Sequence, residues 1–173
     1  MRLLAAILVL SVACAPAGTA GSAGASGSTA AAPDPANATF KIGGDNVTLA
    51  NGRAERDAAP GSATKTVTTL TDKRASGDVD GDGRPDTIVV LIHQPGGTGS
   101  FYYLAALLNT PSGTTVTPAV LLGDRVVVNA VRLDARTVVV DMLDRPAGQP
   151  LTASPTVTAT KRFVVDRGTL AAQ

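Results

Sequence analysis

The 173-residue sequence predicts a mainly β protein, with an antiparallel sheet of about eight to ten strands that is curled or folded into a sandwich. Three observations support this fold class. Val, Thr, Ala and Gly are abundant, a composition that favours strands and turns. Short segments alternate apolar with polar residues, as half-buried strands do. Turn-forming residues separate these segments, so we expect a single domain built from strands.

Residues 1–13 predict a bacterial signal peptide that precedes this domain. Met1-Arg2 forms a short positive start, and the apolar run Leu3–Leu10 has eight residues. A membrane-spanning helix needs about 20 apolar residues, so the run is typical of a signal sequence. The sequence Leu-Ser-Val-Ala-Cys that ends at Cys14 resembles the lipobox of bacterial lipoproteins. This resemblance implies cleavage after Ala13 and a lipid on Cys14; an ordinary signal peptide cut a few residues later is the alternative.

Residues 14–36 are expected to form a flexible tether behind the lipid-carrying cysteine. The segment Ala15–Ala36 contains only Ala, Gly, Ser, Thr and Pro besides one charged residue, Asp34. Such a segment cannot bury enough apolar surface to order itself, and as a flexible coil it would span about 25 Å. Cys14 is the only cysteine, so the globular domain, residues 37–173, must fold without disulfides and has no thiolate for catalysis or metal binding.

The first half of the domain predicts four strands. Thr39–Ile42 and Val47–Leu49 flank the turn-rich quartet Gly43–Asn46, which indicates a hairpin. Lys65–Leu70 alternates between two faces. Ile88–Ile92 is apolar throughout, which predicts a central strand buried on both faces.

The second half continues this pattern. Phe101–Leu108 begins with aromatic residues that favour a strand and ends in Leu and Ala residues that favour a helix; we predict a strand. Val126–Asp144 predicts a hairpin that turns at Asp134–Arg136. One face of its first strand would carry Val127, Val131 and Leu133. A last long strand would carry, on one face, Val157, Ala159, Phe163 and Val165.

The sharpest motif is an aspartate-rich loop before the predicted central strand. Counted from its first residue, it has carboxylates at positions 1, 3, 5 and 9 and a glycine at position 6: Asp78, Asp80, Asp82, Asp86 and Gly83. This is the spacing of a calcium loop, in which alternate side chains turn inward and glycine permits a sharp bend. Position 7 is Arg84, whose backbone carbonyl would serve as a ligand despite the charged side chain.

The loop departs from an EF-hand at position 12, where Val89 replaces the bidentate glutamate because the chain has already entered a strand. It resembles instead the aspartate-rich loops of FG-GAP and integrin-type blades, which run directly into a strand. Those folds repeat the loop and this chain has one copy, so a propeller is not implied. The alternative is a polar turn that binds nothing, but four carboxylates in nine residues repel one another unless a cation lies among them.

Other candidate sites are weaker. Pro95–Ser100 is glycine-rich, but strands flank it, so a hairpin loop is favoured over a phosphate cradle. His93 is the only histidine, and a structural role is favoured over a catalytic triad. The aromatic residues Phe101–Tyr103 fit either the core or a binding platform. Leu122–Arg125 and Asp144–Pro146 indicate charged turns.

The order of several short motifs resembles a widespread group of uncharacterised bacterial envelope lipoproteins. The resemblance extends over nearly all of residues 37–173, and the motifs that carry it are Asn37–Thr39, Ala58–Ala63, Gly77–Asp86, Pro95–Tyr103, Leu121–Arg125 and Asp144–Pro146. The resemblance implies a location in the cell envelope but no activity, so the calcium prediction depends on the loop itself.

These observations predict a lipid-anchored, extracytoplasmic module in which structural calcium stabilises the β domain, with an envelope protein or a glycan as partner. The formal charge is +1, and the loss of Arg2 leaves the mature chain nearly neutral, which argues against nucleic acid. We expect no enzymatic activity. The alternative is a hydrolase of envelope polymers that uses Asp141 and Asp144 with a loop aspartate. Ala15 carries no aspartate retention signal, so an outer membrane, where the cell has one, is an allowed destination.

Overall fold

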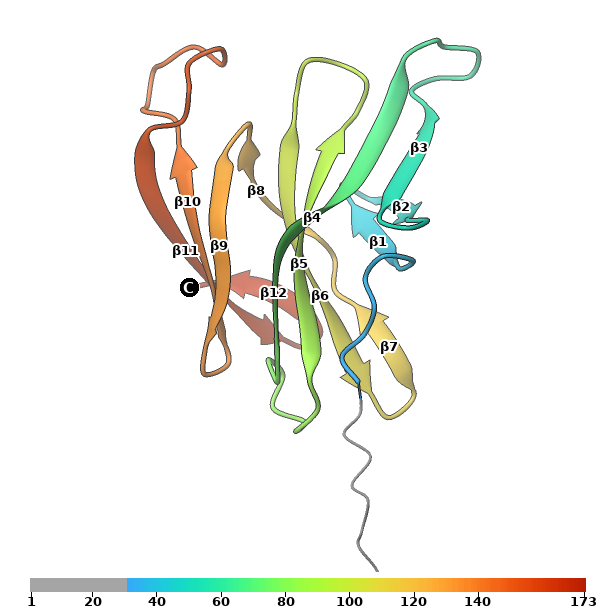
Figure 1. Cartoon of the computed structure of the whole chain (residues 1–173), viewed down its shortest axis with the longest axis vertical. Coiled ribbons are helices and arrows are strands. Elements are labelled where there is room, and N and C mark those ends of the chain that lie inside the picture. The colour runs from blue at the N-terminus through green and yellow to red at the C-terminus, as the bar shows by residue number, and fades with distance from the viewer. Residues whose placement is uncertain (1–30) are drawn as a thin grey trace, which may run out of the picture.

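The computed structural model of the chain describes residues 31–173, which form twelve strands and no helix (Figure 1). The strands are β1 (Thr39–Ile42), β2 (Asp45–Thr48), β3 (Arg53–Asp57), β4 (Lys65–Gly77), β5 (Asp86–Gln94), β6 (Phe101–Thr110), β7 (Gly113–Val116), β8 (Val120–Asp124), β9 (Val127–Asp134), β10 (Thr137–Asp144), β11 (Val157–Asp166) and β12 (Thr169–Ala172). The predicted mainly β fold with curled antiparallel sheets is confirmed. The sequence did not predict the short strands β3, β7 and β12, and β8 includes residues that were expected to form a charged turn.

Three sheets build the domain. The largest has six strands in the order β3-β4-β5-β6-β7, with β8 also paired to β6, and a second has the order β12-β11-β10-β9. The hairpin β1-β2 forms the third. All strand pairs are antiparallel, and two-residue turns connect β1 to β2, β6 to β7, β9 to β10 and β11 to β12.

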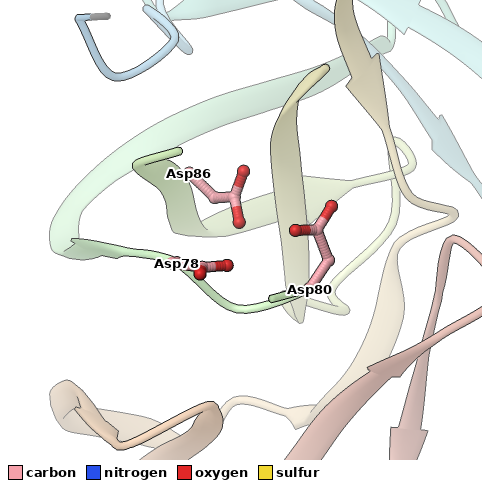
Figure 2. A group of neighbouring side chains, drawn as sticks. All are labelled: Asp78, Asp80 and Asp86. Atoms are coloured by element: carbon pink, nitrogen blue, oxygen red, sulfur yellow. The ribbon is translucent and has the colours of Figure 1, made fainter. Parts of the chain in front are cut away.

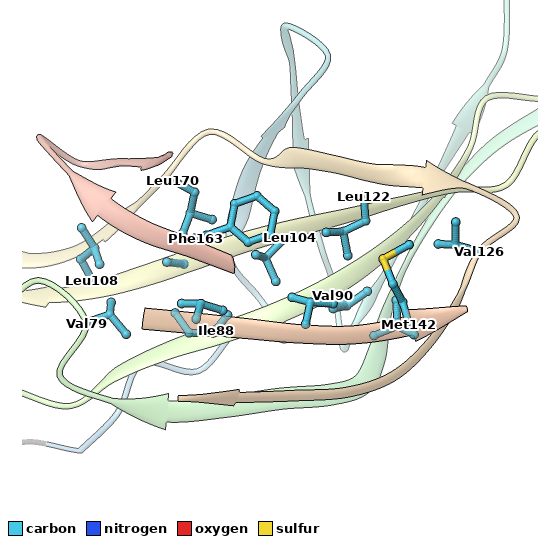
Figure 3. Close-up of a cluster of buried hydrophobic side chains, with 14 residues drawn as sticks. Val79, Ile88, Val90, Leu104, Leu108, Leu122, Val126, Met142, Phe163 and Leu170 are labelled. Carbon is cyan, nitrogen blue, oxygen red and sulfur yellow. The ribbon is translucent and has the colours of Figure 1, made fainter. Parts of the chain in front are cut away.

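The central strand β5 separates two hydrophobic cores. Ile88 and Val90 point into the larger core, between the six-stranded and four-stranded sheets (Figure 3). Val89 and Leu91 point the other way, into a smaller core under the β1-β2 hairpin. All four side chains are fully buried, which confirms the predicted central strand and its continuous apolar sequence.

Two hairpins show how turns set the strand pairing. In β1-β2 the turn is only Gly43-Gly44, because β2 begins at Asp45 rather than at Val47. Both glycines have positive φ, 58° and 103°, as a two-residue hairpin turn requires. The predicted hairpin Val126–Asp144 is also present, as β9 and β10, and its turn is Ala135-Arg136.

A β-bulge changes which valine of β9 is buried. Val128 pairs with Met142 and Ala130 pairs with Asp141, so the residue between them, Asn129, is extra on this strand. Val128 therefore points into the core, and Val127 is 44% exposed. The prediction that Val127 shares the core-facing side with Val131 and Leu133 is wrong, because side chains on the two sides of a bulge change phase.

The last predicted long strand is β11, and the core-facing prediction holds for most of it. Phe163 is buried in the larger core, and Ala159 and Val165 pack against that core. Val157 is 46% exposed, so its predicted burial is wrong. It opens the strand opposite Asp144, the last residue of β10, where the sheet ends.

Contacts with the domain begin before Asn37. Thr87 donates a hydrogen bond to the Pro33 carbonyl at 2.8 Å, and the Gly52 amide donates to the Ala36 carbonyl at 2.7 Å. The end of the predicted tether therefore lies against the six-stranded sheet. The predicted signal peptide and Cys14 lie outside the described residues, and within residues 31–173 no helix is long and apolar enough to cross a bilayer.

Candidate metal site

The aspartate-rich loop joins β4 to β5, and its first carboxylate shapes it. Asp78 Oδ1 accepts a hydrogen bond from the Gly81 amide at 2.6 Å, and Oδ2 accepts from the Gly83 amide at 3.0 Å. Both glycines have positive φ, 88° and 82°, a conformation that costs other residues free energy. The alternation of Asp and Gly in the sequence thus produces a tight coil of backbone around one carboxylate.

The next two aspartates continue the coil. Asp80 Oδ1 accepts from the Asp82 amide at 3.1 Å. Asp82 in turn accepts from the Arg84 amide at 2.8 Å and from the Arg84 guanidinium at 2.7 Å. These are the short-range side-chain-to-backbone bonds that aspartate favours in turns. The carboxylate of Asp82 is therefore engaged by Arg84.

Asp86, the first residue of β5, is fully buried. Its Oδ2 accepts from the Val79 amide at 2.9 Å, and its Oδ1 accepts from the Asn109 amide at 2.8 Å. Burial raises the pKa of Asp86 and the two hydrogen bonds counteract this effect only in part, while nearby carboxylates add to the rise. Asp86 thus connects the start of the loop to the end of β6.

Three of the predicted ligand residues converge. Asp78, Asp80 and Asp86 each offer one carboxylate oxygen, and these oxygens all lie within 4.8 Å of one another (Figure 2). Asp82 does not belong to this group of three, and the side chain of Arg84 forms an ion pair with Asp82. The loop therefore presents a three-carboxylate group at the start of the central strand.

A cation from the other sheet also reaches this loop. Arg136, in the β9-β10 turn, donates a hydrogen bond to the Asp80 carbonyl. Its guanidinium lies against Gly81, where an added methyl group would come within 2.6 Å of Arg136 Cζ. Burial raises the pKa of Asp78, but hydrogen bonds from Gly81 and Gly83 and the charge of Arg136 outweigh it, so the pKa lies below its usual value.

Sequence reasoning missed Arg136 because it lies 56 residues from Asp80 and belongs to a different sheet. The close approach of β4 to β9 brings it near. Gly77 lies so close to Leu133 that a methyl group on the glycine would come within 2.6 Å of Leu133 Cδ1. Arg84 and Arg136 offset two of the four aspartates, which leaves a formal charge of −2.

The weaker candidates have ordinary structural partners. His93 Nδ1 lies 2.9 Å from Thr68 Oγ1, and its ring meets Tyr103 edge-on at 6.2 Å. Burial and the positive charge of Arg56 lower the pKa of His93. Tyr102 packs against the larger core and Tyr103 against the smaller one, so these two half-buried aromatic residues belong to opposite faces of the sheet.

The acidic residues of the hydrolase alternative are also engaged. Asp141 accepts hydrogen bonds from Thr160 at 2.9 Å and from Arg132 at 3.3 Å. Asp144 accepts from the Arg145 amide at 2.7 Å. Glu55, the only glutamate of the sequence, lies on β3, where its side chain pairs with Arg53 at 2.8 Å. The predicted hairpin loop at Pro95–Ser100 does connect β5 to β6.

No protein family, no curated protein and no solved structure matches the chain. The resemblance to envelope lipoproteins with an FG-GAP-like loop therefore stays a prediction, and the functional argument depends on the geometry of the loop.

Proposed function

We propose that the protein is a membrane-anchored, extracytoplasmic lipoprotein whose β domain is stabilised by calcium and acts as a non-enzymatic binding or structural module. The convergence of Asp78, Asp80 and Asp86 carries the calcium part of this proposal. The lipobox-like sequence at Cys14 carries the anchor. Calcium would hold the β4-β5 loop rigid at the point where the chain enters the central strand.

The oxygen spacing suits calcium. Calcium binds oxygen at about 2.3–2.6 Å, so two ligands of one ion lie at most about 5 Å apart. The three carboxylate oxygens, within 4.8 Å of one another, meet this limit. Carboxylate oxygens are hard ligands and disfavour zinc or copper, while magnesium requires a tighter octahedron and keeps its waters.

The affinity is expected to be modest. The loop lacks the bidentate glutamate, and Arg136 already supplies positive charge beside Asp78. A dissociation constant of about 0.1–1 mM is typical of extracellular calcium modules. At calcium concentrations about tenfold above that constant, binding would stabilise the fold by about 1.4 kcal/mol.

Thermal unfolding of residues 31–173 tests the calcium site. Millimolar calcium should raise the melting temperature above its value in EDTA by several degrees, and magnesium should raise it less. Asp80→Asn should abolish the calcium effect, while the matched control Asp72→Asn, on an 82% exposed side chain, should preserve it. Equal melting temperatures in EDTA and calcium, with no heat of binding by calorimetry, would reduce the loop to a polar turn.

Mass spectrometry tests the anchor separately. Protein extracted from membranes should begin at Cys14 and carry a diacylglyceryl group, and Cys14→Ser should release it from the membrane. A mature chain without lipid mass would contradict the anchor but would leave the calcium site untouched.

Assays of hydrolysis test the non-enzymatic part. We expect no turnover of glycan, peptide or ester substrates by the purified protein. Turnover that Asp141→Asn or His93→Ala abolishes in a still-folded protein would instead support the hydrolase alternative.

A further inference from the structure

Two sheet edges lack a neighbouring strand. In the described part of the chain, β8 pairs with β6 alone. The first half of β11, residues 157–162, pairs with β10 along one edge. Along its other edge, β12 pairs only with residues 163–166, and the Gln173 amide donates one further hydrogen bond to the Arg162 carbonyl. In an antiparallel strand about half of the backbone groups point toward each edge, so both strands present donors and acceptors to an additional strand, apart from the Leu122 carbonyl of β8, which already accepts from Lys161.

These two edges face each other across a groove. Lys161 of β11 donates a hydrogen bond to the Leu122 carbonyl of β8 at 2.6 Å. Phe163 and Leu122 point from the same two strands into the larger core, which forms the floor between them (Figure 3). The groove has a volume of about 430 Å³ and is lined by Val120, Leu121, Thr160, Lys161, Arg162, Phe163, Ala172 and Gln173. The two sheets are thus left open along this side.

The groove is partly apolar and carries one half-buried positive charge, that of Lys161. Its lining contains no aspartate or glutamate, and its other basic residue, Arg162, pairs through its exposed side chain with Asp134 at 3.4 Å. Within the described residues no carboxylate lies within 4.0 Å of the half-buried Lys161 ammonium, which bonds a backbone carbonyl. Leu121 is 49% exposed at the rim. Partly buried charges usually have a partner of opposite charge, so we expect an anionic group of a ligand to bind Lys161.

We propose that this groove binds an extended, acidic segment of a partner protein, which adds as a strand to the free edge of β8 and places a carboxylate on Lys161. This is recognition by strand addition, in which main-chain hydrogen bonds supply affinity and alternate side chains supply specificity. The proposal rests on the proposed role as a binding module and names the chemistry of the partner. A second copy of this chain fits less well, because a two-fold contact at this groove brings Lys161 close to its own copy and supplies no carboxylate from the groove lining.

A synthetic peptide tests the groove directly. The probe is a fluorescein-labelled nonapeptide of alternating valine and threonine with one central glutamate, added to the full-length protein purified from membranes in detergent. Fluorescence anisotropy should show saturable binding. Replacing the glutamate by lysine, or methylating alternate backbone nitrogens, should abolish it, because these changes remove the carboxylate and the strand donors respectively.

Two variants locate the site. Lys161→Gln should weaken binding about tenfold or more, because a hydrogen bond to a charged group is lost. Leu121→Glu, which changes an exposed side chain and so preserves the fold, should weaken it by charge repulsion. The control Lys73→Gln, on a lysine that pairs with Asp72, should bind as the unaltered protein does.

Several results would overturn the proposal. These are the absence of saturable binding, equal binding of the methylated peptide, or unchanged binding by both groove variants. A dimer that forms through this face and excludes the peptide would assign the groove to a second copy instead. Titrations in EDTA and in calcium separate this proposal from the calcium site: binding without any calcium effect leaves the groove standing, and a calcium effect without binding removes only the groove.

Discussion

The two ends of the six-stranded sheet are held together by opposite chemistry. At one end, the β4-β5 loop wraps its own backbone amides around carboxylates. At the other end lie three loops: Pro95–Ser100, the turn at Arg125, and residues 145–156 (Figure 1). Arginine side chains bind these loops through backbone carbonyls rather than amides. We call the end of the sheet with the β4-β5 loop the acidic end and the opposite end the arginine end.

Two arginines form the contacts of the arginine end. Arg125 donates to the Thr98 carbonyl and, at 3.0 Å, to the Leu151 carbonyl. Arg145 donates to the Ala153 carbonyl at 3.0 Å and to the Asp124 carbonyl at 3.3 Å. A guanidinium has five donors in a rigid fork, so one side chain can satisfy carbonyls from separate loops.

The difference lies in the range of the contacts. Most bonds of the acidic end join residues two to seven positions apart, and only those from Asn109 and Arg136 reach further, whereas both side-chain partners of Arg125 lie 26 and 27 positions away. A short-range carboxylate coil leaves excess negative charge in one place, which suits a cation. Long-range guanidinium bonds instead hold loops together. Single substitutions test this contrast, from the largest expected effect to the smallest.

Asp86→Ala should have the largest effect. It leaves the amides of Val79 and Asn109 without their acceptor, and each buried amide left unpaired costs about 1–3 kcal/mol, so we expect about 2–6 kcal/mol of destabilisation. Urea unfolding followed by circular dichroism measures it. The control Asp82→Ala, which loses a surface ion pair, should cost about 1 kcal/mol or less. Equal losses in the two variants would contradict the role of Asp86 as the connecting residue.

Arg125→Ala should open the arginine end. Its side chain is 26% exposed, and the loss of its charged hydrogen bonds should destabilise the fold by about 1–2 kcal/mol. The larger signal should be local: limited proteolysis should cut residues 145–156 faster. Arg167→Ala, on a 91% exposed side chain, is the control and should leave cleavage unchanged. Unchanged proteolysis in Arg125→Ala would mean that the loops hold together without it.

Gly81→Ala and Gly83→Ala separate backbone strain from the contact with Arg136. Both glycines have positive φ, so each substitution should cost about 1 kcal/mol. Only at Gly81 does the new methyl group meet the Arg136 guanidinium; at Gly83 the space is open. Gly81→Ala should therefore cost more, and the difference should vanish in an Arg136→Ala background. Equal costs in the presence of Arg136 would show that its contact adds nothing.

Asp141→Asn should have the smallest effect on the free energy of unfolding, and this effect should depend most clearly on pH. A hydrogen bond from Thr160 lowers the pKa of Asp141, and the nearby Arg132 lowers it further. Burial raises it by less, so the pKa lies below its usual value. The stability it contributes is present above the unfolded pKa of about 3.9 and is lost as the pH falls through the lower folded pKa. The stability difference between the unaltered protein and Asp141→Asn should thus shrink below about pH 4.

The contribution of Asp86 to stability should depend on pH in the opposite direction to that of Asp141. Its pKa is raised, mainly by burial, so the folded state binds the proton more tightly than the unfolded state. Its ionisation therefore costs stability, and this cost is relieved as the pH falls through the raised folded pKa. The free energy of unfolding of the unaltered protein, minus that of Asp86→Asn, should therefore increase as the pH falls. A difference that decreases on acidification, as expected for Asp141, would contradict the burial of an ionised Asp86.

Calcium binding is expected to weaken at the pH at which Asp86 becomes protonated. The ligands must be ionised, and the raised pKa of Asp86 means that it loses its charge before Asp78 does. The calcium-induced rise in melting temperature should therefore fade on acidification.

Much of the fold could be predicted because its signals are local. The uninterrupted apolar sequence of Ile88–Ile92 identified the central strand, and paired glycines identified the first hairpin. Strand β3 was missed because its sequence, Arg-Ala-Glu-Arg-Asp, is mostly charged and only its place beside β4 makes it a strand. The exposure of Val127 was missed because a bulge at Asn129 is set by pairing with β10, not by the sequence of β9.

The sequence by itself determined the coil of the Asp78–Asp86 loop, because each aspartate bends the backbone only a few residues away and the glycines permit the turns. Only the tertiary structure decided that Asp86 would be fully buried, that Asn109 would donate to it, and that Arg136 would reach the loop from the other sheet. The same holds for the groove between β8 and β11. These features depend on which strands become neighbours, and that choice follows from the burial of the two cores as a whole rather than from any short segment.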